Sequence, residues 1–161
     1  MPVPDFVLAL RTHVGHSPLW LPAVTAVVLR GDEVLLIQRS DSLAWTPVTG
    51  IVDPGEQPAV AAAREVAEET GVRVEIESLA WVNASGLTVH VNGDEVYYLD
   101  HLFRCRYLSG TAHVADEESV EVAWFPLKQL PPMDPVYQER IGCAVEGHPK
   151  TRFEHDMAEA T

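Results

Sequence analysis

Hydrophobic and polar residues follow one another along the chain in patterns that predict both strands and helices. Runs rich in β-branched residues and bounded by turn residues predict strands, whereas apolar residues at helical spacing beside a capping residue predict helices. Gly31 and Asp32 separate two apolar runs, as is typical of a hairpin turn. The predicted strands are residues 22–30, 33–39, 72–84, 95–108 and 119–127, and the predicted helices are residues 5–15, 57–70 and 134–145.

The order of these elements indicates an α/β fold, in which helices pack on a mixed sheet to give three layers. A chain of 161 residues has the size of one domain, so we expect a single domain over residues 1–161. Within it, residues 1–20 are expected to form an N-terminal helical extension, and the polar residues 147–161 are expected to form a flexible tail.

The stretch between the second strand and the second helix, "TPVTGIVDPGEQP" (residues 46–58), is rich in proline and glycine. No regular element can run through all of it, so it is predicted to be a loop. The helix that follows has marked ends, because Pro58 suits a first helical position and Gly71 suits a C-terminal cap.

That helix carries three glutamates, Glu65, Glu68 and Glu69, which fall on one stripe roughly 100° wide. Carboxylates at these spacings repel each other, and the negative end of the helix dipole lies nearby. A cation would remove this repulsion, and carboxylate oxygens suit Mg²⁺ or Mn²⁺ better than zinc. The alternative is an acidic face that is merely solvated. The opposite face is expected to pack on the sheet, and it comprises Ala59, Val60, Ala63, Val66, Ala67 and Thr70.

The overall charge limits the partners that the chain can bind. Eleven basic and 24 acidic residues give a formal charge of −13, which disfavours binding to nucleic acid or to an anionic membrane. An anionic substrate would therefore bind at a locally positive spot or through a metal ion. No apolar run approaches the roughly 20 residues of a membrane span, and the N-terminal residues do not have the pattern of a signal peptide. We therefore predict a cytoplasmic protein.

The loop and the acidic helix together form a recognisable motif. Glu56 lies at the helix entrance and Arg64 borders the acidic stripe, so the two could pair, or Glu56 could support the metal ligands. The stretch from Gly50 to Val72 resembles the signature of the Nudix hydrolases, G-x5-E-x7-R-E-U-x-E-E-x-G-U, where U is aliphatic. Every specified position is met, and the flanks from Val24 to Pro131 resemble the family more loosely.

This resemblance implies an α/β/α sandwich and an enzyme that depends on a divalent metal, Mg²⁺ or Mn²⁺. The implied reaction is hydrolysis of the pyrophosphate linkage of a nucleoside diphosphate joined to another moiety, as in a dNTP, an oxidised dNTP, a nucleotide sugar or ADP-ribose. The implied partner is a small nucleotide, and a homodimer through the N-terminal helix is compatible with the resemblance. The alternative is a non-catalytic Nudix-fold sensor that binds a nucleotide, but such domains often lack one or more of the acids that are intact here.

The resemblance also implies roles for individual residues. Glu68 and Glu69 would be the main metal ligands, and Glu65 would be a further ligand or the base that activates water. Glu56 would orient or complete the metal shell, and Arg64 would hold the acids by ion pairing. In some family members a glutamate on a later loop is the base instead, and in "DEESVEV" we favour Glu118 over its neighbours Glu117 and Glu121.

Residues outside the acidic helix bear on the metal shell and the substrate. Before the signature, "WTPVTG" has Val48 and Thr49 where many Nudix hydrolases have proline and glycine. The resemblance implies that the Thr49 carbonyl would be the backbone metal ligand. Arg39 could contact a phosphate or be an ordinary surface arginine, and Trp45 could stack on a base or pack in the core. Leu87 and Thr88 occupy the region where some subfamilies carry a proline or tyrosine that marks their substrate.

Overall fold

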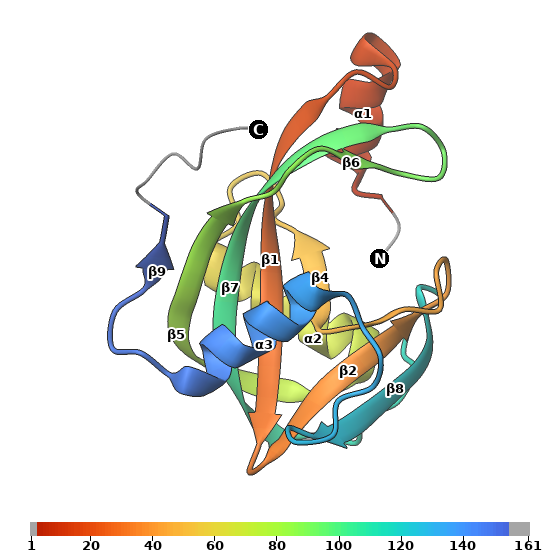
Figure 1. The fold of residues 1–161 in the computed structure, drawn as a ribbon. Coiled ribbons are helices and arrows are strands. Elements are labelled where there is room, and N and C mark those ends of the chain that lie inside the picture. Colours follow the sequence, from red (N-terminus) through yellow and green to blue (C-terminus); the bar gives the residue numbers. More distant parts are fainter. Residues whose placement is uncertain (1–2, 155–161) are drawn as a thin grey trace.

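The computed structural model describes residues 3–154. Figure 1 shows a curved central sheet with helix α2 on one face and helix α3 on the other. The elements are α1 (Asp5–Val14), β1 (Leu19–Arg30), β2 (Glu33–Arg39), β3 (Trp45–Thr46), β4 (Val48–Ile51), α2 (Pro58–Thr70), β5 (Arg73–Ala84), β6 (Thr88–Val89), β7 (Glu95–Ser109), β8 (Ser119–Pro126), α3 (Pro135–Glu146) and β9 (Arg152–Phe153).

The sheet is mixed, with its main strands in the order β3-β2-β1-β7-β5-β9. Strands β4, β6 and β8 branch from this path and pair with β1, β7 and β2 respectively. The β1–β7 and β5–β9 pairs are parallel and the others are antiparallel. This arrangement confirms the predicted α/β fold with a mixed sheet.

The central strand β1 is buried on both faces because helices cover both sides of the sheet. Its alternate residues Val24, Ala26 and Val28 join the core cluster beneath α2, whereas Val27 and Leu29 join the cluster beneath α3. All five strands and three helices predicted from the pattern are present, with boundaries shifted by a few residues.

The N-terminal helix α1 packs on the ends of β1 and β7 that project beyond the helices α2 and α3 (Figure 1). Val7 is its buried residue and lies against Leu21 and Val96. Strand β1 begins at Leu19, three residues before the predicted start, so residues 19 and 20 belong to the sheet rather than to the helical extension. Among residues 3–154, no helix is long and apolar enough to cross a membrane.

Four short strands are absent from the prediction. Strand β4 lies within the proline- and glycine-rich stretch predicted to be a loop and pairs with residues 23–26 of β1. Strand β3, at the start of that stretch, pairs with β2. Strand β6 pairs with β7, and β9 pairs with β5. A strand of two to four residues is too short to show alternation, so only its partner strand, distant in sequence, defines it.

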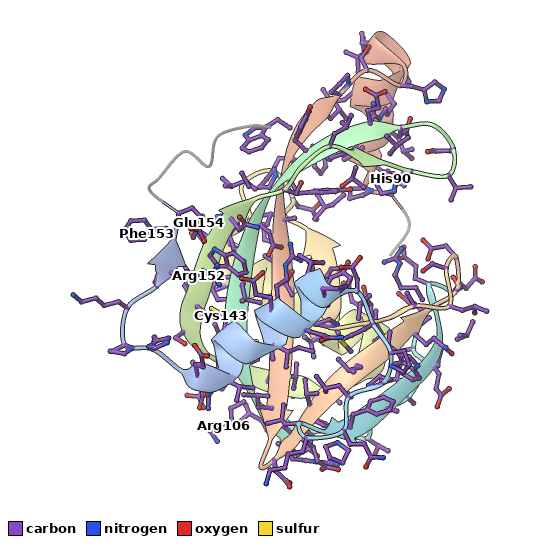
Figure 2. All side chains as sticks on the ribbon, viewed as in Figure 1. His90, Arg106, Cys143, Arg152, Phe153 and Glu154 are labelled. Carbon is purple, nitrogen blue, oxygen red and sulfur yellow. The ribbon has the colours of Figure 1, made fainter. Side chains whose placement is uncertain are left out.

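Strand β9 lies where the sequence pattern predicts a flexible tail. Arg152 pairs in register with Trp81, and its guanidinium lies 3.9 Å from the centre of the Trp81 ring. The same guanidinium is 2.9 Å from the Glu139 carboxylate of α3. Figure 2 labels Arg152 and Phe153, the two residues of β9. Residues 147–154 therefore include a strand attached to the sheet and to α3, and the prediction of a tail over residues 155–161 falls outside the described residues.

Candidate active site

Helix α2 turns a different face to the sheet from the one that we predict. Its buried residues are Ala61, Ala62, Glu65, Val66, Glu69 and Thr70, whereas Val60 is 57% exposed. The prediction was correct for Val66 and Thr70 and wrong for Val60 and Ala67, which are exposed. Alanines occur all around this helix, so they do not define one apolar stripe. As a consequence, the carboxyl groups of Glu65 and Glu69 point into the protein.

The backbone of β4 passes directly beside the Glu65 carboxyl group. A methyl group built on Gly50 would overlap the Glu65 carboxyl carbon and Oε1, so only glycine permits this approach. Glu65 is 0% exposed and Glu69 is 2% exposed. Within residues 3–154, the Oε2 atom of each is buried without a hydrogen-bond partner. Leaving a buried polar atom unpaired is costly, which makes these two oxygens candidate ligand atoms.

The surroundings favour the protonated forms of both carboxyls when no cation is bound. Burial raises the pKa of Glu65 from its usual 4.5 to about 7, because water no longer stabilises the charge. Burial, followed by the charge of Glu65, raises the pKa of Glu69 to about 8. Asp116 and Glu118 add to the negative potential at Glu69. A divalent cation would reverse this preference for the neutral forms.

Arg64 connects the loop before α2 to the acids on α2. Its Nε and Nη2 atoms donate to the two carboxylate oxygens of Glu56, each at 2.8 Å, which is a bidentate pair. Its Nη1 donates to Glu65 Oε1 at 3.0 Å and to Glu68 Oε2 at 3.2 Å. The hydrogen bond with Arg64 lowers the pKa of Glu56. Of the two alternatives for Glu56, the structure therefore contains the ion pair.

The third acid on the helix lies apart from the other two. The Glu68 side chain is 50% exposed and ion-paired with Arg64. Among the described residues, no group of three or more His, Cys, Asp or Glu side chains is arranged to hold a metal ion. The donor set still fits Mg²⁺ or Mn²⁺, because it offers hard carboxylate oxygens and two of these are buried and unpaired. Thr49 lies in β4 next to Gly50 and opposite Thr25 of β1.

The loop between β7 and β8 is attached to the end of α2. The His113 amide donates to the Thr70 carbonyl at 3.1 Å, and the Ala115 amide donates to the Glu69 carbonyl at 3.2 Å. These bonds satisfy two carbonyls that have no partner within the helix. The loop thereby brings Glu118 near Glu69, together with Asp116, which the sequence reasoning missed. Asp116 Oδ1 accepts a hydrogen bond from the Glu118 amide at 3.1 Å.

The two residues predicted to bind substrate are engaged with the protein. Arg39 donates from Nε and Nη2 to Asp41, at 3.0 and 2.8 Å, and this hydrogen bonding raises the pKa of Arg39. Trp45 packs edge-on against Phe125, with 4.8 Å between ring centres, and both rings are partly buried against the core cluster on the α3 side. This contact corresponds to core packing, one of the two alternatives for Trp45, and stacking on a base stays a prediction.

Comparison with known proteins places this geometry in a family. Residues 19–143 match the NUDIX domain. A MutT-like protein of Streptomyces ambofaciens is 34% identical over 135 residues, which are 81% of this chain and 80% of that protein. An NAD-capped RNA hydrolase of Stutzerimonas stutzeri is 32% identical over 125 residues, which are 73% of this chain and 41% of that protein.

A solved structure shares the fold. The ADP-ribose pyrophosphatase of Streptococcus suis has a TM-score of 0.64 and 25% identity, with 83% of this chain and 98% of that chain covered. Apart from the Streptomyces protein, seven curated relatives are covered over only 30% to 52% of their own lengths. The matched region contains the complete signature and both buried glutamates, and this chain belongs to the NUDIX domain family.

Proposed function

We propose that this chain hydrolyses the pyrophosphate linkage of a nucleoside diphosphate joined to another group, with Mg²⁺ or Mn²⁺ held by Glu65, Glu68 and Glu69. Two relatives, named an NAD-capped RNA hydrolase and an ADP-ribose pyrophosphatase, support this proposal, because both names describe hydrolysis of a nucleotide-linked compound. The observation that carries the proposal is the pair of buried oxygens on Glu65 and Glu69, which find no hydrogen-bond partner within residues 3–154.

Each residue of the site is proposed to have its own role in binding the metal ion and the substrate. A bound cation would neutralise the diphosphate and lower the pKa of a water molecule, which explains how a chain of charge −13 accepts an anion. Glu65 and Glu69 would hold it from the buried side, and Glu68 would turn from Arg64 toward it. Arg64 would keep the acids and the loop in register through its pair with Glu56. The Thr49 carbonyl would add a backbone ligand.

The base that takes a proton from water is proposed to be Glu118, with Glu65 as the alternative. Glu118 is on the loop that is hydrogen-bonded to the end of α2, and its charge contributes to the raised pKa of Glu69. The charge of Glu118 also contributes to the raised pKa of Arg39, so this arginine is a cation beside the same loop. Arg39 could contact a phosphate only by sharing its guanidinium with Asp41.

We propose a class of substrates for this chain and not a single compound. The relatives include a protein named for NAD-capped RNA and one named for ADP-ribose, and the moieties attached to the diphosphate differ between them. We propose a dNTP, an oxidised dNTP, a nucleotide sugar or ADP-ribose for this chain. A cytoplasmic location and a homodimer through the N-terminal helix stay predictions from the sequence.

The test is a panel of these four substrate types, incubated with pure protein and Mg²⁺ or Mn²⁺, with the products identified by mass. We expect one class to release a nucleoside monophosphate, phosphate or pyrophosphate, and the E68Q/E69Q double variant to lose this activity. Glu75→Gln is the matched control, since Glu75 pairs with Arg106 on the β5–β7 side of the sheet. Nucleotide binding without turnover would favour the sensor function instead.

A further inference from the structure

A second group of polar side chains is buried on the α3 face of the sheet. Thr25 on β1 is 0% exposed and Asp100 on β7 is 4% exposed. The Thr25 hydroxyl donates to Asp100 Oδ1 at 2.9 Å and accepts from Arg140 Nη1 of α3 at 2.9 Å. Arg140 Nη2 lies 3.6 Å from Asp100 Oδ2. One hydroxyl therefore joins a buried carboxylate to a largely buried guanidinium.

Burying the charges of Asp100 and Arg140 costs free energy, so this group is an inefficient way to attach helix α3 to the sheet. Replacing a buried ion pair by apolar residues often leaves stability unchanged or improves it. Helix α3 already has two buried apolar residues, Ile141 and Ala144, that pack on the sheet. Within the described part of the chain, the Arg140 Nε atom is buried and unpaired, which adds to the cost. The packing of α3 on the sheet therefore does not depend on this group alone.

The position of Thr25, Asp100 and Arg140 in the sheet suggests a further role for them. Strand β4, which carries Thr49 and Gly50, pairs with β1 and, over residues 3–154, with no other strand. The pairing covers four residues of each strand, and Thr25 lies directly opposite Thr49 while Val24 lies opposite Gly50. On the other side, this part of β1 pairs with the part of β7 that contains Asp100. The polar group thus sits where β4 joins the sheet.

We propose that Thr25, Asp100 and Arg140 are positioning residues for the metal site. By linking β1, β7 and α3, they fix the segment of β1 to which β4 is attached. The backbone of Thr49 and Gly50 is then held against the Glu65 carboxyl, where even a methyl group would not fit. Sites of this kind depend on supporting residues that keep the ligand atoms in place. The inference rests on the proposed function, because it concerns the same metal.

The hydroxyl of Thr25 is the part of the group that a substitution can remove most cleanly. Thr25→Val keeps the shape but can neither donate to Asp100 nor accept from Arg140. We expect it to weaken Mn²⁺ binding by about tenfold, as is typical when a residue that orients a metal ligand is lost. The Mg²⁺ concentration for half-maximal activity should rise by a similar factor, while kcat at saturating Mg²⁺ changes little. Thr25→Ser, which keeps the hydroxyl, should bind Mn²⁺ like the wild type.

A control separates positioning from ordinary loss of stability. Ile141→Val removes one methyl group from the buried face of α3 without touching the polar group. It should lower the melting temperature but leave Mn²⁺ binding, measured by calorimetry on the metal-free protein, unchanged. The proposal is overturned if Thr25→Val binds Mn²⁺ like the wild type, or if Ile141→Val weakens binding equally. A wild type that binds Mn²⁺ but hydrolyses nothing would contradict the proposed function, whereas the two variants would still decide the positioning role.

Discussion

Buried carboxylates lie on both faces of the sheet, and they differ in whether their oxygens have partners. On the α3 face, Asp100 accepts a hydrogen bond from Thr25 and pairs with Arg140. On the α2 face, Glu65 and Glu69 each bury an oxygen that, in the described part of the chain, nothing contacts by hydrogen bonding. The fold itself satisfies the first carboxylate. The fold does not satisfy the buried oxygens of Glu65 and Glu69, and a bound ligand would satisfy them.

The largest expected effect is on the α2 face. Glu69→Gln removes a charge that the metal needs, so activity should fall by more than the roughly 10- to 100-fold typical of residues that only orient a ligand. The metal-free protein at pH 8 should become no less stable, because a neutral amide avoids the cost of a buried charge. Steady-state rates at saturating Mg²⁺ and thermal melting without metal would measure the two effects. A variant that loses stability and keeps activity would contradict the assignment.

The corresponding change on the α3 face should have the opposite effect on stability. Asp100→Asn leaves Arg140 buried without a counter-charge, so the free energy of unfolding should fall by about 3 kcal/mol, the lower end of the range for a broken buried pair. Urea unfolding of the metal-free protein would measure it. If Asp100→Asn and Glu69→Gln changed the stability equally, the distinction between paired and unpaired carboxylates would fail.

The pH dependence of stability should also reflect the unpaired pair. The folded-state pKa values of Glu65 and Glu69, about 7 and about 8, lie above the ordinary value of 4.5. The folded state therefore binds more protons than the unfolded state between pH 4.5 and 8, and stability falls as the pH rises through this range. The lowered pKa values of Asp41 and Glu56 act only below it.

We therefore expect the metal-free protein to melt several degrees lower at pH 8.5 than at pH 5.5, by calorimetry. Mg²⁺ added at pH 8.5 should restore much of the difference, because it binds the charged carboxylates. Glu69→Gln should flatten the pH dependence and remove most of the Mg²⁺ effect. A wild type whose melting temperature rises with pH over this range would argue against the buried position of the two acids.

The fold was predictable where the chain carries long patterns. Strands β1, β2, β5, β7 and β8 are long enough to show apolar runs, and α2 has a proline at its start and a glycine at its end. The pairing of β4 was not predictable, because its four residues show no pattern and their position depends on β1, more than 20 residues earlier. The sequence also could not show that the apolar side of α2 includes Ala61 and Ala62 rather than Val60.

The site was predictable to the extent that it is encoded in one contiguous motif. Spacing alone predicted that Glu56 and Arg64 could pair, and they do. It did not predict that Glu68 faces solvent while Glu65 and Glu69 are buried, because that depends on how the helix is rotated against β4. Nor could it predict the group of Thr25, Asp100 and Arg140, whose members are separated by 75 and 115 residues from Thr25 and meet only through the sheet.

The smallest expected effect comes from matched glycine-to-alanine substitutions, one on each face. A methyl group on Gly142 of α3 would meet no atom within 4 Å, so Gly142→Ala should raise the free energy of unfolding by about 0.5–1 kcal/mol, the usual cost of glycine inside a helix. Mn²⁺ binding should not change. Gly50→Ala instead forces the Glu65 carboxyl away from β4 and should weaken Mn²⁺ binding. Equal Mn²⁺ affinities for the two variants would show that the close approach of Gly50 to Glu65 has no part in holding the metal.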